Sequence, residues 1–244
     1  MTEESIKIKL QDIQDAAERL RGVLKPTPLF ESEYFSKLSG NTIFFKPENL
    51  QVTGAYKIRG AYNKINSLDK NSIKNGLIAA SAGNHAQGVA FAAKKLNLKA
   101  VIVMPKSTPL VKIQATEQYG AEIVLAGDCY DEAYEYAKEL SKKKKLTFIH
   151  PFDDWDIIAG QGTIGLEILN ELKDIDAIVV PVGGGGLIAG VAISAKEINP
   201  KIKIIGVEPK GADAMSKSLS AGKIVELNEV VTVADGVAVK KVGE

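Results

Sequence analysis

The pattern of apolar and polar positions predicts a chain that alternates between short strands and longer helices. Apolar residues recur at helical spacing over residues 10–24, which predicts a first helix. Pro26 and Pro28 stop this helix. Continuous apolar runs such as 100–103 and 177–180 are typical of strands that are buried on both faces. The pattern predicts strands at residues 42–46, 77–80, 99–104, 121–125, 146–149, 177–182 and 203–207.

Further helices are predicted in most of the gaps between these strands, and the alternation indicates the fold class. Buried strands that are separated by helices build parallel sheets with helices on each side. We therefore expect an α/β fold. The 244 residues are enough for one large domain or two small ones. The predicted helices cover residues 84–96, 110–119, 130–143, 157–171 and 187–198.

Composition and charge exclude several classes of protein. Apolar residues make up 45% of the chain and charged residues 25%, which excludes a disordered chain. The net charge is +1, so no basic field is available for nucleic acid or an anionic membrane. No stretch approaches the ~20 apolar residues of a membrane span. We expect neither a nucleic-acid partner nor a membrane partner.

Cysteine and histidine are scarce, and this limits metal and disulfide chemistry. Cys129 is the single cysteine, which excludes an internal disulfide and a cysteine-based zinc site. His85 and His150 are the two histidines, so a site built from several histidines is not expected. We predict no metal and a reducing, cytoplasmic setting.

Ligands of α/β proteins bind at the carboxyl ends of strands, and two glycine-containing segments lie there. Residues 81–88 follow a predicted strand, and the free N–H groups of the helix that they open make an anion site. An ordinary turn that is capped by Ser81 or Asn84 is an equal alternative. The second segment holds four consecutive glycines, which a plain turn does not need but which suit a phosphate. These are Gly183, Gly184, Gly185 and Gly186.

A third segment and a competing motif leave the interpretation open. Residues 54–61 contain Lys57 among glycines, and by themselves they indicate only a turn. Residues 184–189 match the dinucleotide fingerprint G-x-G-x-x-A, and Glu208 follows Gly186 by 22 residues. An NAD-binding oxidoreductase is therefore an alternative, although it gives the segments 54–61 and 81–88 no role.

Together, the three segments closely resemble those of threonine dehydratases. Residues 48–61 resemble the cofactor-lysine segment of that family, residues 81–88 its asparagine loop, and residues 183–187 its phosphate loop. The resemblance extends from the Pro-Thr-Pro-Leu of residues 26–29 to the segment 234–239. This family is part of the fold-type II group of pyridoxal phosphate (PLP) enzymes, which also includes serine racemase.

The resemblance implies a fold of two parallel-sheet domains, similar to the β subunit of tryptophan synthase, with PLP in the cleft between them. Residues 1–67 and 149–244 would form a large PLP-binding domain, and residues 68–148 a smaller inserted one. The core of the family continues past residue 244 and supplies a small hydroxyl residue that faces the pyridine nitrogen. We therefore expect a C-terminally truncated chain.

The resemblance also assigns roles to individual residues. Lys57 would form the Schiff base with PLP and take the Cα proton of the substrate. Tyr56 stands where the family usually has a phenylalanine beside the cofactor. The expected cofactor-binding residues are Lys57, Tyr56, Asn84, Gly183, Gly184, Gly185, Gly186 and Leu187. The expected substrate-binding residues are Ser81, Ala82, Gly83 and His85.

The implied activity is the PLP-dependent dehydration and deamination of L-threonine to 2-oxobutanoate and ammonia, and of L-serine to pyruvate. A serine racemase-like enzyme, an NAD-binding oxidoreductase and a degenerate cofactor-binding module are the alternatives. Ala82 argues against a racemase, because a methyl group cannot return a proton to the far face of the substrate. The resemblance also suggests isoleucine biosynthesis or threonine catabolism, a nucleotide or amino-acid effector, and a homo-oligomer when the protein is full length.

Overall fold

The computed structural model describes residues 8–244, so the first seven residues of the expected large domain lie outside the described part. Three sheets are present among these residues. A four-stranded sheet has the order β5-β4-β3-β6, and β7 and β8 form a two-stranded sheet. Both are parallel, as the buried strands predict. β1 (Phe30–Glu31) and β2 (Phe44–Phe45) form a small antiparallel pair.

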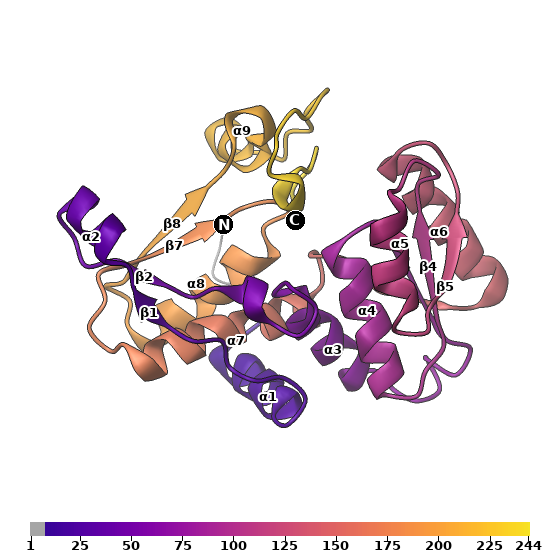
Figure 1. The fold of residues 1–244 in the computed structure, drawn as a ribbon, viewed down its shortest axis with the longest axis horizontal. Helices are drawn as coiled ribbons and strands as arrows, with labels where there is room; N and C mark the ends of the chain where they lie inside the picture. The colour runs from indigo at the N-terminus through magenta and orange to yellow at the C-terminus, as the bar shows by residue number, and fades with distance from the viewer. Residues whose placement is uncertain (1–7) are drawn as a thin grey trace.

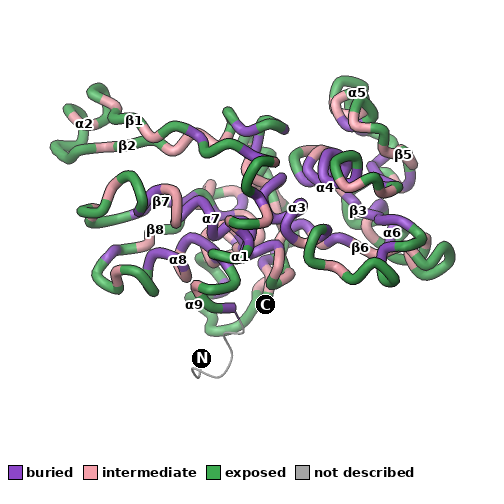
Figure 2. The backbone as a smooth tube through the Cα atoms, turned by 90° about the horizontal axis from the view of Figure 1, so that it is seen from below, coloured by how far each residue is buried: buried purple, intermediate pink, exposed green. Residues whose placement is uncertain are grey.

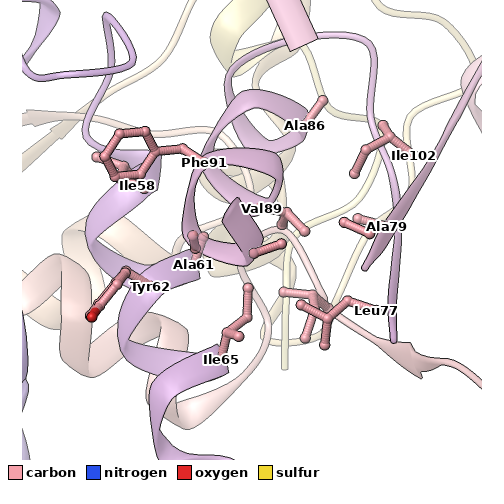
Figure 3. Close-up of a cluster of buried hydrophobic side chains, with 14 of the residues drawn as sticks. Ile58, Ala61, Tyr62, Ile65, Leu77, Ala79, Ala86, Val89, Phe91 and Ile102 are labelled. Atoms are coloured by element: carbon pink, nitrogen blue, oxygen red, sulfur yellow. The ribbon is translucent and has the colours of Figure 1, made fainter. Parts of the chain in front are cut away.

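The four-stranded sheet lies between helices (Figure 1). Its strands are β3 (Leu77–Ala80), β4 (Ala100–Met104), β5 (Glu122–Leu125) and β6 (Thr147–Phe148). The first two are buried at every residue, as predicted. α6 (Tyr130–Lys144) packs Ala133 and Ala137 against one face. α4 (Asn84–Lys95) packs against the other face, and α3 (Lys57–Ser67) packs on α4. Ile58, Val89 and Ile102 belong to the buried cluster that runs from α3 through α4 to the sheet (Figure 3). α5 (Leu110–Glu117) connects β4 and β5.

The two-stranded parallel sheet consists of β7 (Ala177–Pro181) and β8 (Lys203–Val207). α8 (Gly186–Ile198) covers one face, against which Ile178 and Val180 are buried. The prediction that residues 177–180 are buried on both faces is wrong, because Val179 points to the uncovered face and is 62% exposed. The apolar run is therefore covered on one side only among residues 8–244.

Helices α1 (Leu10–Leu20), α3 and α7 (Trp155–Glu171) pack between the two larger sheets, where buried stretches gather in Figure 2. Glycines allow these helices to approach closely. A Cβ on Gly160 would lie 2.5 Å from Gly60 Cα, and one on Gly190 would lie 2.6 Å from Gly162 N. The close packing of α3, α7 and α8 places the start of α3 near the start of α8, which positions the site.

Some elements differ from those that the pattern predicts. The first helix ends at Leu20 rather than at residue 24, and the strand at 42–46 is reduced to β2. α2 (Glu33–Ser39), α3 and α9 (Ala214–Ala221) are helices that the pattern did not predict. No helix within residues 8–244 combines the length and the hydropathy that crossing a bilayer requires.

Candidate active site

Lys57 is the first residue of α3, and its amine lies inside a narrow pocket. The Nζ atom donates a hydrogen bond of 2.7 Å to the carbonyl oxygen of Pro151. No carboxylate within residues 8–244 forms an ion pair with it. Loss of solvent lowers the pKa of Lys57 to about 8. About a tenth of this amine is therefore neutral, and thus nucleophilic, at pH 7, far more than for a lysine with an ordinary pKa.

Aromatic rings flank this amine on two sides. Lys57 Nζ lies 5.6 Å from the centre of the Tyr56 ring and 5.8 Å from the centre of the Phe152 ring. Burial raises the pKa of Tyr56 to about 12, so this phenol stays neutral. Both rings can pack against a flat aromatic ligand that is attached to the amine.

The four glycines also line the pocket and lead into α8. Gly185 is the N-cap of α8 and has φ +100°, a conformation that favours glycine. A Cβ on Gly184 would collide with the Phe152 ring, and one on Gly186 would lie 2.6 Å from the Phe152 carbonyl oxygen. The free N–H groups and the dipole of the helix start attract an anion. The pocket is lined by Tyr56, Lys57, Phe152, Pro181, Val182, Gly183, Gly184, Gly185, Gly186, Leu187, Ile188, Gly236 and Val239.

These residues fit PLP, whose aldehyde and phosphate have different requirements. The aldehyde needs a reactive amine, which Lys57 supplies with a pKa lowered to about 8. The phosphate needs a cluster of backbone N–H groups that side chains do not obstruct, and the four glycines at the start of α8 supply such groups. Gly184 and Gly186 also leave room for Phe152, which an added Cβ would meet. The structure thus brings together seven of the predicted site residues, which are Tyr56, Lys57, Gly183, Gly184, Gly185, Gly186 and Leu187.

The remaining predicted site residues lie on the turn between β3 and α4 and at the start of α4, outside the lining of this pocket. Ser81 Oγ accepts a hydrogen bond of 3.2 Å from the N–H of Gly83, and Ala82 is half-buried between them. Asn84 is exposed and faces Gly236 of the pocket, where an added Cβ would lie 4.0 Å from Asn84 Nδ2. This turn therefore borders the pocket through the segment that contains Gly236.

His85 is buried, and its imidazole does not face solvent. The Nε2 atom donates to the carbonyl oxygen of Ile149 at 2.9 Å. Burial and the nearby Lys57 charge lower the pKa of His85 to about 3. Its ring is neutral at physiological pH and engaged with the backbone, so only the backbone N–H of His85 can serve the predicted contact with a carboxylate.

The sequence pattern missed the segment that follows β6. Pro151 supplies the acceptor for Lys57, and Phe152 packs against the glycine loop. The position of this segment is a signal that could have found it, because it follows the carboxyl end of a predicted strand.

A second missed feature is a buried charge network below α3. The Arg59 guanidinium donates to both carboxylate oxygens of Glu48, at 2.7 and 2.8 Å. It also donates to both oxygens of Glu167 on α7, at 2.6 and 3.0 Å. Burial alone would lower the pKa of Arg59, but these two carboxylates outweigh burial and raise it. Lys46 Nζ lies 2.7 Å from Glu167. The network fixes the first turn of α3, and with it Lys57, to α7.

The carboxylate of Glu208 binds the start of α9, whereas the dinucleotide fingerprint requires an acidic side chain that is free to bind a ribose hydroxyl. Its carboxylate accepts hydrogen bonds from the N–H groups of Met215 and Ser216, at 2.9 and 2.8 Å, and one from Ser216 Oγ. Glu208 therefore stabilises the first turn of α9. No group of three or more histidine, cysteine or acidic side chains within residues 8–244 is arranged to hold a metal ion.

The parallel α/β fold and the pocket that joins a reactive amine to a glycine cradle define a class of PLP enzymes. The family model for pyridoxal-phosphate dependent enzymes matches residues 20–244, and the chain belongs to this family. The resemblance that the sequence shows is confirmed. The match favours PLP over the dinucleotide interpretation of residues 184–189.

Particular relatives narrow the comparison. The chain is 49% identical to an L-threonine ammonia-lyase of Thermotoga maritima over 237 residues. This matched region makes up 97% of this chain and 59% of that relative. The processed form of threonine deaminase isoform 2 from Solanum lycopersicum is similar at a TM-score of 0.92 and 50% identity, over 96% of this chain and 64% of that one. Maize serine racemase is similar at a TM-score of 0.94 and 39% identity, over 98% of this chain and 72% of that one. The chain thus spans less than two thirds of the length of several curated relatives.

Proposed function

We propose that this chain carries the cofactor-binding part of an L-threonine ammonia-lyase, which converts L-threonine to 2-oxobutanoate and ammonia and L-serine to pyruvate. One observation carries the proposal. A lysine amine with a pKa of about 8 and a helix start with four consecutive glycines line the same pocket. The 45–52% identity to threonine ammonia-lyases and dehydratases supports the choice of substrate.

The proposed roles follow the geometry of the pocket. Lys57 would hold the aldehyde carbon of PLP covalently, and Tyr56 and Phe152 would pack beside the ring. Asn84 binds the ring hydroxyl from the start of α4. The backbone N–H groups at the start of α8 would hold the phosphate. The residues that would hold it are Gly183, Gly184, Gly185, Gly186 and Leu187.

The turn before α4 is proposed to bind the substrate carboxylate through Ser81, Ala82, Gly83 and His85. The N–H groups of the first turn of a helix have no partner within the helix, so an anion stabilises them. PLP, when bound, supplies an electron sink that makes the Cα proton of an amino acid removable. The free amine of Lys57 would take this proton. The Pro151 carbonyl accepts a hydrogen bond from the resulting ammonium.

Racemisation is the main competing activity, because the chain is also similar to maize serine racemase. Racemisation needs a second acid–base group on the face of the substrate opposite Lys57. Ala82 offers only a methyl group at the start of α4. We therefore favour loss of the β-hydroxyl over return of the proton.

The proposal extends to the setting of the protein. We infer that it acts in the cytoplasm, where the exposed thiol of Cys129 stays reduced. A homo-oligomer and a nucleotide or amino-acid effector are part of the same proposal. Native mass spectrometry with and without nucleotides and branched amino acids tests both.

Product analysis tests the proposed activity. Protein that has been incubated with PLP is given L-threonine, and 2-oxobutanoate and ammonia are measured. We expect equal amounts of both products, and none from the K57A variant. With L-serine, chiral chromatography should detect pyruvate but little D-serine. Abundant D-serine would indicate a racemase rather than a lyase. Absence of 2-oxobutanoate and ammonia would contradict the proposed activity.

A further inference from the structure

Both histidines of the chain form hydrogen bonds with the backbone of one short segment. The segment consists of residues 149–153 and follows β6. At its start, His85 of α4 donates to the carbonyl oxygen of Ile149 at 2.9 Å. Further along, His150 Nδ1 accepts hydrogen bonds from the backbone N–H groups of Phe152, at 3.3 Å, and Asp153, at 2.8 Å. The second contact closes a turn that depends on a single acceptor atom.

This turn carries two contacts to the site. The Pro151 carbonyl oxygen accepts the hydrogen bond from Lys57 Nζ at 2.7 Å. Phe152 contacts the glycine loop, with its ring against Gly184 and its carbonyl oxygen against Gly186. A change in the turn would therefore move the acceptor of the amine and one wall of the phosphate cradle at the same time.

We propose that His150 is a positioning residue, whose unprotonated Nδ1 gathers the N–H groups of Phe152 and Asp153 and so fixes the Pro151 carbonyl on Lys57 and Phe152 on the glycine loop. The part of this inference that concerns PLP rests on the proposed function. The part that concerns the turn does not, because it is a property of the protein alone.

The charges around His150 decide when Nδ1 is free to accept. Burial lowers the pKa of His150 below its usual 6.5, while Asp153 and Asp154 act in the opposite direction. Lys57 of α3 lowers it as well, and His150 and His85 of α4 repel each other when both are charged. The rings of Tyr134 on α6 and of Phe152 stand edge-on to the imidazole. Neutral His150 is therefore the form at physiological pH, and protonation removes the acceptor.

Two substitutions separate the acceptor from the rest of the side chain. In H150N, the amide oxygen sits as many bonds from the backbone as Nδ1 does and can accept the same two N–H groups. In H150Q, the amide oxygen sits one bond further out, at the position of Nε2. Both variants are neutral and polar, so they form a matched pair. Circular dichroism and thermal unfolding establish that both fold.

Hydrogen exchange of the Phe152 and Asp153 amides reads the turn directly, without PLP. We expect wild type and H150N to protect both amides similarly, and H150Q to lose protection by about tenfold, the equivalent of one hydrogen bond. In wild type, protection corrected for intrinsic exchange should fall as the pH drops below the pKa of His150. In H150N it should not fall, because asparagine does not titrate. This comparison needs no H150Q protein.

The affinity for PLP, measured by absorbance, shows how the turn affects the site. We expect the dissociation constant to rise about tenfold in H150Q and to change less than about threefold in H150N. Equal protection of the two amides in all three proteins, or equal damage in H150N and H150Q, would overturn the positioning role. If wild type does not bind PLP, the proposed function fails, and the exchange data still decide whether His150 holds the turn.

Discussion

At the scale of single residues, Lys57 shows how a pocket without a carboxylate sets the chemistry of an amine. Within residues 8–244 its hydrogen-bond acceptor is the neutral Pro151 carbonyl, so loss of solvent is not offset there by an opposite charge. Lys46 behaves differently, because it lies 2.7 Å from Glu167 and has an ionic partner. The contrast explains why, of these two lysines, Lys57 is the one suited to covalent chemistry.

A pH titration tests this difference. The pKa of Lys57 is lowered to about 8, so its reactive neutral form should appear as the pH rises through that value. We expect labelling of Lys57 by a trace amine-reactive reagent to be half-maximal near pH 8. Exposed lysines should follow near pH ~10.4. Mass spectrometry of the labelled peptides measures both curves. A Lys57 curve that coincides with those of the exposed lysines would contradict the effect of the pocket.

Gly185 tests the phosphate cradle. In G185D, a carboxylate would stand at the start of α8, where like charges in a poorly solvated site repel a phosphate. We expect PLP affinity to fall by about a hundredfold or more. G40D is the control, because Gly40 also has positive φ, at +68°, and open space around it. Both substitutions strain the backbone, but only G185D should change PLP binding. Equal PLP affinity in both variants would move the phosphate site elsewhere.

At the scale of elements, α3 shows where prediction from the sequence stops. The helices that start at Asn84, Tyr130 and Gly186 were predicted to within one residue of their starts, because apolar spacing and preceding strands indicate them. α3 was interpreted as a turn because glycines surround Lys57. The structure shows why Gly60 can occur inside a helix, since α7 packs against it with Gly160 in contact. That contact joins residues a hundred positions apart, and no local pattern contains it.

The same limit applies to the candidate site. Lys57 and the four glycines were found because their chemistry is contained in short motifs. The Arg59 network and the turn closed by His150 were not found. Arg59 meets Glu167 across 108 positions of sequence, and Lys57 meets Pro151 across 94. Charged residues that pair over such distances look like ordinary surface charges until the fold brings them together.

Removal of Arg59 tests the role of the network in holding α3. In R59M, Glu48 and Glu167 would lose their main partner in a site with little solvent, which costs about 3 kcal/mol. We expect urea unfolding to show a loss of this size. R21M is the control, because the ion pair of Arg21 with Glu18 is exposed and should contribute under about 1 kcal/mol. If R59M lowers the free energy of unfolding no more than R21M does, the network does not hold α3 and Lys57 in place.

At the scale of the whole molecule, two ion pairs join the segment around Gly236 to α5 and α6, which accompany the four-stranded sheet. Lys112 of α5 pairs with Asp235 at 2.9 Å, and Lys240 pairs with Asp131 of α6 at 3.1 Å. The four-stranded sheet lies entirely within residues 77–148, while β7 and β8 lie further along the chain. We retain the division into residues 1–67 with 149–244, and 68–148, as a proposal. In that division, both ion pairs would cross between the domains.

Salt and substitution test this connection. Both pairs are exposed, so salt should screen them, and each should contribute little to global stability. We expect limited proteolysis within residues 231–240 to accelerate about threefold between about 0.05 and 0.5 M salt. The D131N/D235N double variant should already be cleaved at the faster rate and should not respond to salt. A salt response of the double variant equal to that of wild type would show that other contacts hold the segment.

The central claim is that Lys57 is the residue that holds PLP. The most direct measurement is borohydride reduction of the protein with PLP, followed by proteolysis and mass spectrometry. We predict that the reduced mass of the cofactor is fixed on the peptide that contains Lys57, and that K57A incorporates none at equal PLP. Cofactor mass on a different lysine of the wild-type protein, or equal incorporation in K57A, would contradict the claim.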